Sequence, residues 1–413
     1  MSHSGEPRMR RWREQRWLLD TVVRTIGIEW DQARIGSKSR PLGAEGAAVF
    51  QAVARRIKKY DDIFREFQNE ATKRFNRARE FEADGRAVAA REGYLLAAIL
   101  LSTGIWAIHD DGPVLREAEE KVNQYFAGFM RFAPYPVERV DVPFGDTCMP
   151  AYLHMPRQPA PGEKLPLCIQ IGGMDSSKEN MVQLYGDRML ERGFAILALD
   201  GPGQAEAITR GIFFTESNFG DAAEAVWAWA QQRPEFDMDK VVVRGTSFGS
   251  YFGTVAAAAL GDRIKGFAAQ GVCHEPGCDT IFNQASPTFK MRFMLMSNYT
   301  DEDAFDAFCQ KIDLRPVAPR IKCPYMIVAG ENDQLSPLEH TEHLFTLLNV
   351  PKKLVVYEGA NHGVGDAPSV ANGEDKVTMI ADWLLDRING KRARSERVWI
   401  DAAGRSHVSG FEE

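Results

Sequence analysis

The run VVVRGTSFGS at residues 241–250 places Ser247 between Gly245 and Gly249, in the pattern Gly-x-Ser-x-Gly. Three β-branched residues precede this pattern, and the small-residue segment FGSYFGTVAAAAL follows it. The sequence therefore predicts a strand that turns directly into a helix, with Ser247 at the bend. Such a bend exposes the serine hydroxyl beside the free N–H groups of the helix N-terminus. We predict that Ser247 is a nucleophile.

A serine hydroxyl needs a base, and that base needs a carboxylate to orient it. His362 lies in YEGANHGVG, after the last strand expected in the core, and Asp333 lies in VAGENDQLSP, after the strand before it. Glu331 is the nearby alternative, but Asp333 suits the turn better. The order Ser247, Asp333, His362 is the one expected for a catalytic triad on an α/β-hydrolase sheet.

Attack on a carbonyl also needs donors for the oxyanion that forms. The backbone N–H of Phe248, at the start of the helix, is one candidate. The second donor is expected from the loop after the strand LCIQI, which reads Gly172-Gly173-Met174-Asp175. The glycines there let backbone N–H groups approach the substrate, so we predict either Met174 or Gly173 as this donor.

Glu275 follows the expected strand IKGFAAQG and opens a long segment over residues 273–322. It is either an auxiliary group that faces the substrate or a carboxylate that caps or anchors this segment. The segment is far longer than an ordinary connection and is rich in aromatic residues and methionine. It is therefore a helical excursion with its own small core, a lid over the site, or both.

The other reactive residues do not form a pattern typical of a cofactor site or a metal site. Cys273 and Cys278 flank His274, but no second ligand pair follows, so we interpret the cysteines as reduced thiols. His340 and His343 are three apart on an expected helix, where a solvated face is the favoured interpretation. The run DGPGQAE at 200–206 lacks the pattern of a phosphate loop and is expected to form a turn beside the site.

The elements that position these residues divide the chain into parts. Residues 1–133 show helical spacing and are interpreted as an accessory or cap domain. Residues 134–390 alternate strands with helices, which predicts an α/β fold with a mostly parallel sheet covered on both faces. Residues 391–413 form a polar tail that we expect to be loosely held.

Composition excludes several classes of function. Hydrophobic residues make up 44% and charged residues 26%, with a net charge of −7, which gives no electrostatic footprint for nucleic acid. The longest apolar stretch, 94–108, is shorter than the roughly 20 residues of a membrane span. The charged N-terminus has no apolar core, so we expect no signal peptide and a cytoplasmic location.

Beyond the triad motifs, a narrower resemblance involves EFEADGRAVAAREGYLLAAILL, IGGMDSSKE and LDGPGQAE. This combination resembles the α/β-hydrolase group of 2,6-dihydroxypseudooxynicotine hydrolase, the FrsA-like esterases and the fungal hydrolases that shorten polyketide chains. The resemblance spans roughly residues 45–390. It implies a two-domain serine hydrolase, often a homodimer, whose N-terminal helices cover the substrate pocket.

The same resemblance suggests the chemistry. Several members of the group cleave a carbon–carbon bond next to a ketone on an aromatic substrate. An additional glutamate beyond the triad is implicated in the pseudooxynicotine enzyme, and Glu275 lies at about that place. Aromatic residues of the helices and the 273–322 segment favour an aromatic or greasy small-molecule carbonyl substrate; they include Tyr94, Trp106, Phe126, Phe129 and Phe293.

Three functions remain open at this point. The first is a carbon–carbon bond hydrolase for an aromatic or polyketide-like ketone. The second is a carboxylesterase for an aryl or acyl ester, since the same triad serves either leaving group. The third is a catalytically silent hydrolase-like binding protein, which would predict a broken triad.

Overall fold

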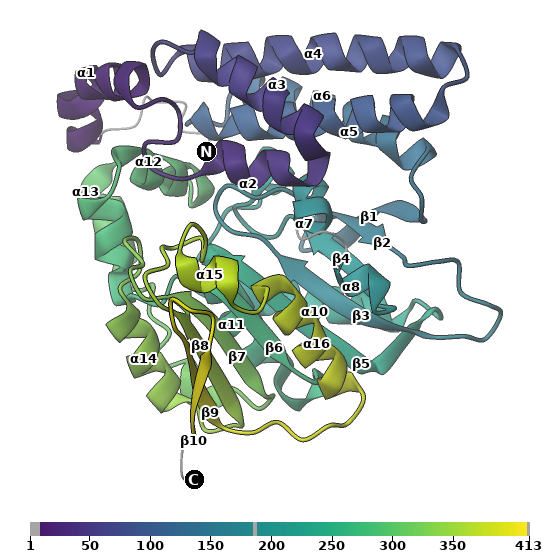
Figure 1. Cartoon of the computed structure of the whole chain (residues 1–413), viewed down its shortest axis with the longest axis vertical. Coiled ribbons are helices and arrows are strands. Elements are labelled where there is room, and N and C mark those ends of the chain that lie inside the picture. Colours follow the sequence, from purple (N-terminus) through teal and green to yellow (C-terminus); the bar gives the residue numbers. More distant parts are fainter. Residues whose placement is uncertain (1–8, 185–187, 411–413) are drawn as a thin grey trace.

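The computed structural model describes residues 9–184 and 188–410. The N-terminal stretch in which no signal peptide was expected begins with residues 1–8, which lie outside this range. The chain begins with a helical layer that lies over one end of a sheet (Figure 1). Its helices are α1 (Arg10–Thr25), α2 (Arg34–Ser39), α3 (Gly43–Arg56), α4 (Asp62–Ala83), α5 (Ala87–Gly104) and α6 (Pro113–Arg131).

A ten-stranded sheet forms the second layer, in the order β1-β2-β4-β3-β5-β6-β7-β8-β9-β10. Strands β4, β3 and β5 to β9 are parallel, whereas β1, β2 and β10 pair antiparallel with their neighbours. The strands are β1 (Val137–Phe144), β2 (Thr147–His154), β3 (Leu165–Ile171), β4 (Ala195–Leu199), β5 (Phe236–Ser247), β6 (Phe267–Val272), β7 (Tyr325–Gly330), β8 (Lys352–Tyr357), β9 (Glu396–Ile400) and β10 (Ser406–Gly410). The predicted mostly parallel α/β fold is confirmed.

Helices cover both faces of this sheet. Successive strand residues point to opposite faces, so Ile169 and Val243 belong to one apolar cluster while Cys168 and Val242 belong to another. The helices that follow the sheet strands are α7 (Lys178–Leu184), α8 (Arg188–Glu191), α9 (Ala205–Thr209), α10 (Asn218–Gln231), α11 (Phe248–Leu260), α14 (Leu338–Leu347), α15 (Pro368–Asn372) and α16 (Lys376–Ile388). Because these strands run parallel, their carboxyl ends all meet at one edge of the sheet, under the helical layer (Figure 1).

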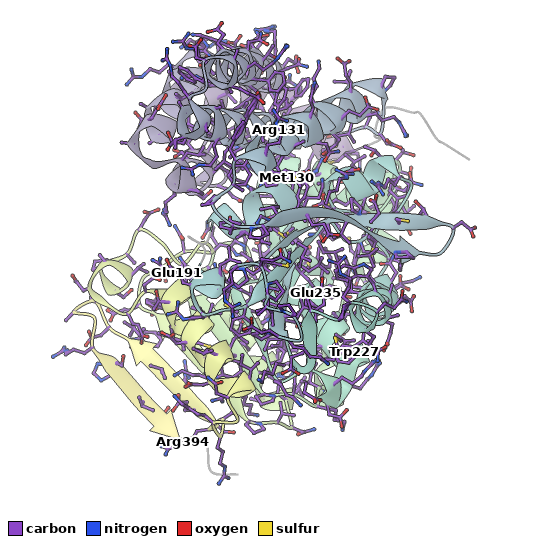
Figure 2. The ribbon with its side chains drawn as sticks, turned by 90° about the vertical axis from the view of Figure 1, so that its right-hand side faces the viewer. Met130, Arg131, Glu191, Trp227, Glu235 and Arg394 are labelled. Atoms are coloured by element: carbon purple, nitrogen blue, oxygen red, sulfur yellow. The ribbon has the colours of Figure 1, made fainter. Side chains whose placement is uncertain are left out.

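The helical layer packs on the sheet through aromatic contacts. The Phe126 ring of α6 lies 4.4 Å from the Tyr152 ring of β2, between ring centres. Figure 2 shows Met130 and Arg131 of α6 just above the strands, while Arg394 lies at the far end of the core. Helix Ala87–Ala107 is long and apolar enough to span a membrane by length and composition, yet 61% of its most apolar stretch is buried inside the protein.

The 273–322 segment folds into short helices beside the helical layer. They are α12 (Pro287–Met296), α13 (Glu302–Cys309), the π-helix Thr280–Gln284 and the 3₁₀ turns Pro276–Cys278 and Ala318–Arg320. Phe293 of α12 packs against Phe282 and also against Phe248, with ring centres 4.9 and 4.4 Å apart. The segment therefore has its own aromatic core and is continuous with the core beneath Ser247.

The C-terminal tail is not loosely held, and that expectation was wrong for residues 396–410. Strand β9 pairs with β8 in parallel, and β10 pairs with β9 as a hairpin. Val398 and Ile400 of β9 are buried, which explains why ERVWI joins the sheet. The polar character of the rest of the tail concealed this short alternating strand.

Candidate active site

Ser247 lies at the junction of β5 and α11, in the strained backbone that its motif predicts. Its φ and ψ are 56° and −126°, in a region that few non-glycine residues adopt. The flanking glycines allow neighbouring chains to pass closely. A Cβ on Gly245 would lie 2.2 Å from the carbonyl oxygen of Gly249, and a Cβ on Gly249 would lie 2.3 Å from the carbonyl oxygen of Ile171. The glycines are therefore steric requirements of the bend.

The structure brings Ser247, His362 and Asp333 together. Ser247 Oγ lies 3.0 Å from His362 Nε2, and His362 Nδ1 lies 2.9 Å from Asp333 Oδ2. Asp333 Oδ1 also accepts hydrogen bonds of 2.9 Å from the backbone N–H groups of Leu335 and Ser336. The carboxylate is thus buried and held in one orientation toward the imidazole.

Glu331, the alternative carboxylate, points elsewhere. Its Oε2 accepts a 2.7 Å hydrogen bond from the backbone N–H of Gly359. The loop after β8 is thereby tied to the loop after β7, where Asp333 lies. Glu331 supports the arrangement of these loops and makes no contact with His362.

The loop after β3 lies directly against the nucleophile. A Cβ on Gly173 would lie 2.8 Å from the Cβ of Ser247, so only glycine leaves room there. The Gly173 N–H donates to Ser176 Oγ at 3.2 Å, whereas the Met174 N–H donates to no other described residue. Of the two predicted donors, the geometry therefore favours Met174 as partner of the Phe248 N–H.

Gln204, in the run DGPGQAE, braces this oxyanion loop. Its side-chain Nε2 donates to the carbonyl of Gly172 at 2.7 Å and to that of Gly173 at 3.3 Å. Its side-chain oxygen accepts from the backbone N–H of Gly201 at 3.1 Å. The predicted turn beside the site is thus a support for the loop after β3, a role that the sequence did not reveal.

Helix α2 of the helical layer holds the same loop from the other side. Arg34 Nη2 donates to Asp175 Oδ2 at 3.0 Å, and Lys38 Nζ donates to the backbone carbonyl of Asp175 at 2.8 Å. Arg34 also pairs with Asp31 and lies over the Trp106 ring, 3.8 Å from its centre. The segment before residue 45, to which the sequence assigned no function, therefore contributes to the site.

A buried charge cluster anchors the helix that follows the oxyanion loop. Lys178 Nζ lies 2.7 Å from Glu179, 2.8 Å from Glu206 and 3.2 Å from Asp200. The Lys178 backbone N–H also donates to Asp200 Oδ1 at 2.7 Å. This ties the start of α7 to the end of β4 and to α9, so the loop has fixed supports at both ends.

A cavity of about 290 Å³ opens in front of Ser247 and His362. Its walls come from α2, the oxyanion loop, the ends of β5 and β6, and the loop after β8. Most of the lining residues are polar, and none of those described is aromatic; they include Gln32, Arg34, Lys38, Arg40, Asp175, Thr246, Gln270, Gln334, Asn361, Asp366 and Lys376. None of the aromatic residues from which an aromatic or greasy substrate was expected lines this cavity.

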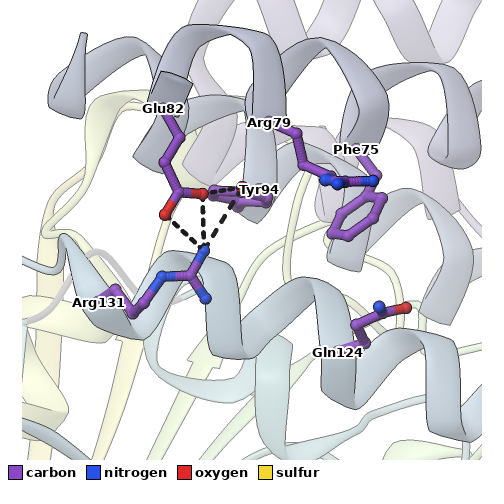
Figure 3. A pocket seen from close by; sticks show the side chains of 6 residues that line it. All are labelled: Phe75, Arg79, Glu82, Tyr94, Gln124 and Arg131. Carbon is purple, nitrogen blue, oxygen red and sulfur yellow. Dashed lines mark hydrogen bonds and ion pairs between the residues drawn. The ribbon is translucent and has the colours of Figure 1, made fainter. Parts of the chain in front are cut away.

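The aromatic residues expected there pack elsewhere. Phe126 and Phe129 lie against each other and Phe293 lies against Phe248. Tyr94 borders a separate pocket of about 360 Å³ among α4, α5 and α6, where Arg131 approaches Glu82 (Figure 3). Their burial reflects ordinary core packing, which an apolar pattern alone does not distinguish from a binding wall.

Glu275 is not among the residues that line the cavity. Its carboxylate accepts from the backbone N–H of Thr280 at 2.9 Å and from the Thr280 hydroxyl at 3.0 Å, and it lies 3.8 Å from His340 Nε2. Of the two roles left open by the sequence, the structure gives it the capping one. The auxiliary role toward the substrate has no support in this geometry.

His274, Cys273 and Cys278, which lie near Glu275 in the sequence, are buried. His274 Nδ1 lies 3.2 Å from the Thr341 hydroxyl, and burial lowers the pKa of its imidazole to about 3. Cys273 Sγ lies 3.9 Å from Ser247 Oγ, and burial raises the pKa of its thiol. Over residues 9–184 and 188–410, no group of three His, Cys, Asp or Glu side chains has the arrangement of a metal site.

Comparison with known proteins places these features in a wider context. Residues 187–391 match the prolyl oligopeptidase family. One curated relative is the α/β hydrolase psoB of Aspergillus fumigatus, which is 25% identical; the match covers 66% of this chain and 72% of that protein. Another is the hydrolase acrC of Aspergillus aculeatus, which is 26% identical; the match covers 68% of this chain and 77% of that protein. The hydrolyase poxO of Penicillium oxalicum is 28% identical, but the match covers only 44% of its length.

Solved structures extend the likeness to the helical layer. The crystal structure of 2,6-dihydroxy-pseudo-oxynicotine hydrolase matches with a TM-score of 0.72 and 20% identity, and covers 87% of this chain and 97% of that one. Wild-type AbyA5 matches with a TM-score of 0.61 and 17% identity, over 86% and 99%. The shared fold therefore includes both the sheet and much of the helical layer.

Proposed function

We propose that this chain, which has an α/β-hydrolase fold and in which Ser247, His362 and Asp333 lie in hydrogen-bonded series, is a serine hydrolase of small-molecule carbonyl compounds. The 3.0 Å contact between Ser247 Oγ and His362 Nε2 is the observation that carries this proposal. It places the base within reach of the proton that the hydroxyl must lose.

In the first step, Ser247 Oγ attacks the substrate carbonyl carbon while its proton moves to His362 Nε2. The carbonyl oxygen gains a negative charge, which the N–H groups of Phe248 and Met174 stabilise. Asp333 keeps the imidazole oriented and stabilises its charged form. The tetrahedral intermediate then collapses, the leaving group takes the proton from His362, and an acyl-serine remains. A water molecule, deprotonated by His362, releases the acid and restores the serine.

We propose a carbon–carbon bond next to a ketone as the bond that breaks. In an aryl β-diketone or an acyl-phenol, the leaving carbon departs as a stabilised enolate or phenolate-type anion and takes a proton from His362. The likeness to 2,6-dihydroxy-pseudo-oxynicotine hydrolase over 87% of the chain supports this choice. The charged and amide side chains among the lining residues can bind the oxygen atoms of an aromatic or polyketide-like compound.

A carboxylesterase is the second candidate. The match of residues 187–391 to the prolyl oligopeptidase family favours a leaving group that departs through a heteroatom. An alkoxide or phenoxide needs only the proton of His362, so the same site would serve.

Product analysis distinguishes these two candidates. The purified chain is incubated with an aryl β-diketone and with an aryl ester that yields the same acid, and the products are identified by mass spectrometry. Release of the methyl ketone and the acid from the diketone supports carbon–carbon cleavage, whereas turnover of the ester alone supports the esterase. Ser247→Ala serves as the control for uncatalysed breakdown of each substrate.

Labelling with an alkyl phosphonate tests whether the site is catalytically silent. The wild-type chain should gain the mass of one phosphonyl group, and the Ser247→Ala variant should gain none. If the wild-type serine takes no label, the hydrolase proposal fails.

A further inference from the structure

We propose that the cavity in front of Ser247 selects substrates that carry a carboxylate, which Arg40, Lys376 and Lys38 bind on the wall formed by α2, the turn that follows it and the start of α16. This inference deepens the proposed function, because it names the charge of the carbonyl compound that the hydrolase accepts. It rests on which charged groups line the cavity and on which of them already have partners.

The charges of the lining residues are unevenly paired. Arg34 is already engaged by Asp31 and by Asp175, so it adds little attraction for a ligand. In contrast, no ion pair joins Lys38, Arg40 or Lys376 to another described residue. Of the two described acids that line the cavity, Asp175 pairs with Arg34, whereas Asp366 forms no ion pair with a described residue. Arg34, Lys38, Arg40 and Lys376 line the cavity together with Asp175 and Asp366, and Asp31 also pairs with Arg34, so the cations exceed the acids by one around the nucleophile.

Lys38 is a buried cation that forms no ion pair with another described residue, although the Asp175 carboxylate, which Arg34 binds, lies near enough to raise its pKa. Its ammonium donates to the backbone carbonyl of Asp175 at 2.8 Å, a contact that neutralises no charge. Burial is the largest influence on this group and lowers its pKa to about 8. A buried ammonium without an ion pair is costly, so an anion placed beside it gains interaction energy without displacing an existing ion pair.

Lys376 and Arg40 form the outer part of the same wall. Lys376 Nζ donates to the carbonyls of Gly363 and Val364, which leaves one N–H and the full charge for a ligand. Burial, and then the nearby guanidinium of Arg40, lower the pKa of Lys376 to about 8. Arg40 is exposed, and its guanidinium makes no hydrogen bond to another described residue. Two adjacent cations that repel each other are stabilised together by one shared carboxylate.

A neutral hydroxyl group lies beside the nucleophile in the same cavity. The Thr246 hydroxyl precedes Ser247 and lines the cavity, and its oxygen is buried without a hydrogen-bond partner. It can donate its proton to an oxygen of the ligand. With cations on one wall and the reacting serine on the other, a carboxylate would fix which carbonyl of the substrate faces Ser247.

Binding to a protein that cannot turn over tests the inference separately from the catalytic proposal. The probes are 2,4-dihydroxybenzoate and its amide, which match in size and in aromatic oxygens but differ in charge. Their dissociation constants for Ser247→Ala are measured by titration calorimetry at low salt. We expect the acid to bind about tenfold more tightly than the amide, as charge-assisted hydrogen bonds require.

Variants of the cationic wall then identify its residues. Arg40→Gln should reduce the preference for the acid about threefold, as for an exposed charge, and Arg40→Glu should abolish it. Lys376→Met should weaken acid binding and leave amide binding unchanged, and Lys376→Arg should preserve the preference. The exposed Lys391, outside the cavity, provides the control variant Lys391→Gln.

The outcome separates this inference from the proposed function. Equal affinity for acid and amide, absence of acid binding at millimolar concentration, or a preference unchanged in Arg40→Glu would each overturn the carboxylate site. Phosphonate labelling of Ser247 in the wild-type chain is independent of the ligand charge. A labelled serine in a protein without acid preference refutes the inference alone, whereas an unlabelled serine refutes the hydrolase.

Discussion

Arg34 in the helical layer donates to the carboxylate of Asp175 at 3.0 Å, and Asp175 directly follows Met174, the favoured second oxyanion donor. The two residues are 141 positions apart in the chain. Both side chains are largely buried, so the contact is shielded from solvent and from salt. The position of one wall of the active site thus depends on a helix that lies outside the sheet.

Replacement of Arg34 should damage catalysis more than substrate binding. We expect Arg34→Met to lower kcat by about tenfold to a hundredfold with little change in KM, because a displaced oxyanion donor costs about 10²–10³ in kcat. Steady-state kinetics on the best ester substrate measures both parameters.

The controls for this variant address folding. Removal of Arg34 leaves the buried carboxylates of Asp31 and Asp175 without their cationic partner, which costs roughly 3–5 kcal/mol of stability. Circular dichroism must therefore show that the variant is folded at the assay temperature, and Arg34→Lys should recover part of kcat. Arg55→Gln on α3 is the exposed comparison. A raised KM with normal kcat would contradict a positioning role.

Gly173 offers a steric test of the oxyanion loop. In Gly173→Ala the new Cβ would lie 2.8 Å from the Cβ of Ser247, so the loop or the nucleophile must move. We expect kcat to fall at least about tenfold. Gly220→Ala is the matched control, because its Cβ would lie 3.6 Å from the nearest atom, in ordinary contact. Near-normal activity of Gly173→Ala would show that the loop is free to shift.

The two carboxylates after β7 can be distinguished by isosteric variants. Asp333→Asn should lower kcat by about 10⁴-fold, the loss seen when the triad aspartate of a serine protease is replaced in this way. Glu331→Gln should retain most activity, since Glu331 contacts the Gly359 N–H and not the imidazole. The reverse result would assign the triad carboxylate to Glu331.

Lys38 predicts a pH dependence of stability. Burial lowers its pKa to about 8 in the folded chain, with Arg34 and Asp175 as the charged groups that face it. The unfolded chain keeps the ordinary lysine pKa of about 10.4, so between these values it binds more protons than the folded chain. The free energy of unfolding should therefore rise as the pH increases from about 8 toward 10.

Urea unfolding of the wild type and of Lys38→Met measures this effect. Burial of the charged ammonium lowers the free energy of unfolding of the wild type below pH 8, and this loss is relieved above pH 8. Lys38→Met has no ammonium and therefore lacks this loss at every pH. The stability difference between the two proteins should shift in favour of the wild type at the higher pH. A difference that is constant with pH would show that Lys38 titrates normally.

The C-terminal strand predicts a stability effect far from the site. Ile400 of β9 is fully buried, and Ile400→Ala should lower the free energy of unfolding by roughly 2–4 kcal/mol. Val408 of β10 is 63% exposed, so Val408→Ala should change it by about 0.5 kcal/mol or less. Chemical denaturation measures both, and equal effects would mean that the tail does not pack as described.

Local patterns were enough to predict the elements that carry the reacting residues. The alternation of buried strands and helices predicted the fold, and Ser247, Asp333 and His362 each directly follow an expected strand. Parallel strands end at one edge, so these residues were expected to meet there, and the structure brings them within hydrogen-bond distance.

The supports of the site had no comparable local signal. The contacts of Arg34 and Lys38 with Asp175 join positions far apart in the sequence, and each side chain alone resembles an ordinary surface charge. The aromatic residues suggested a substrate site but pack in the core, because core packing and a binding wall share the same apolar pattern. Strand β9 was missed although ERVWI alternates, since polar residues on both sides conceal it.

The ion pair between Arg34 and Asp175 limits how this protein can be recombined with its relatives. A chimera with a protein that lacks either Arg34 or Asp175 would leave the other buried charge without its ion-pair partner. Exchange of the two parts should therefore succeed only when positions 34 and 175 are transferred as a pair. For protein engineering, Arg34 and Asp175 should be exchanged together, wherever the boundary between the two exchanged parts is placed.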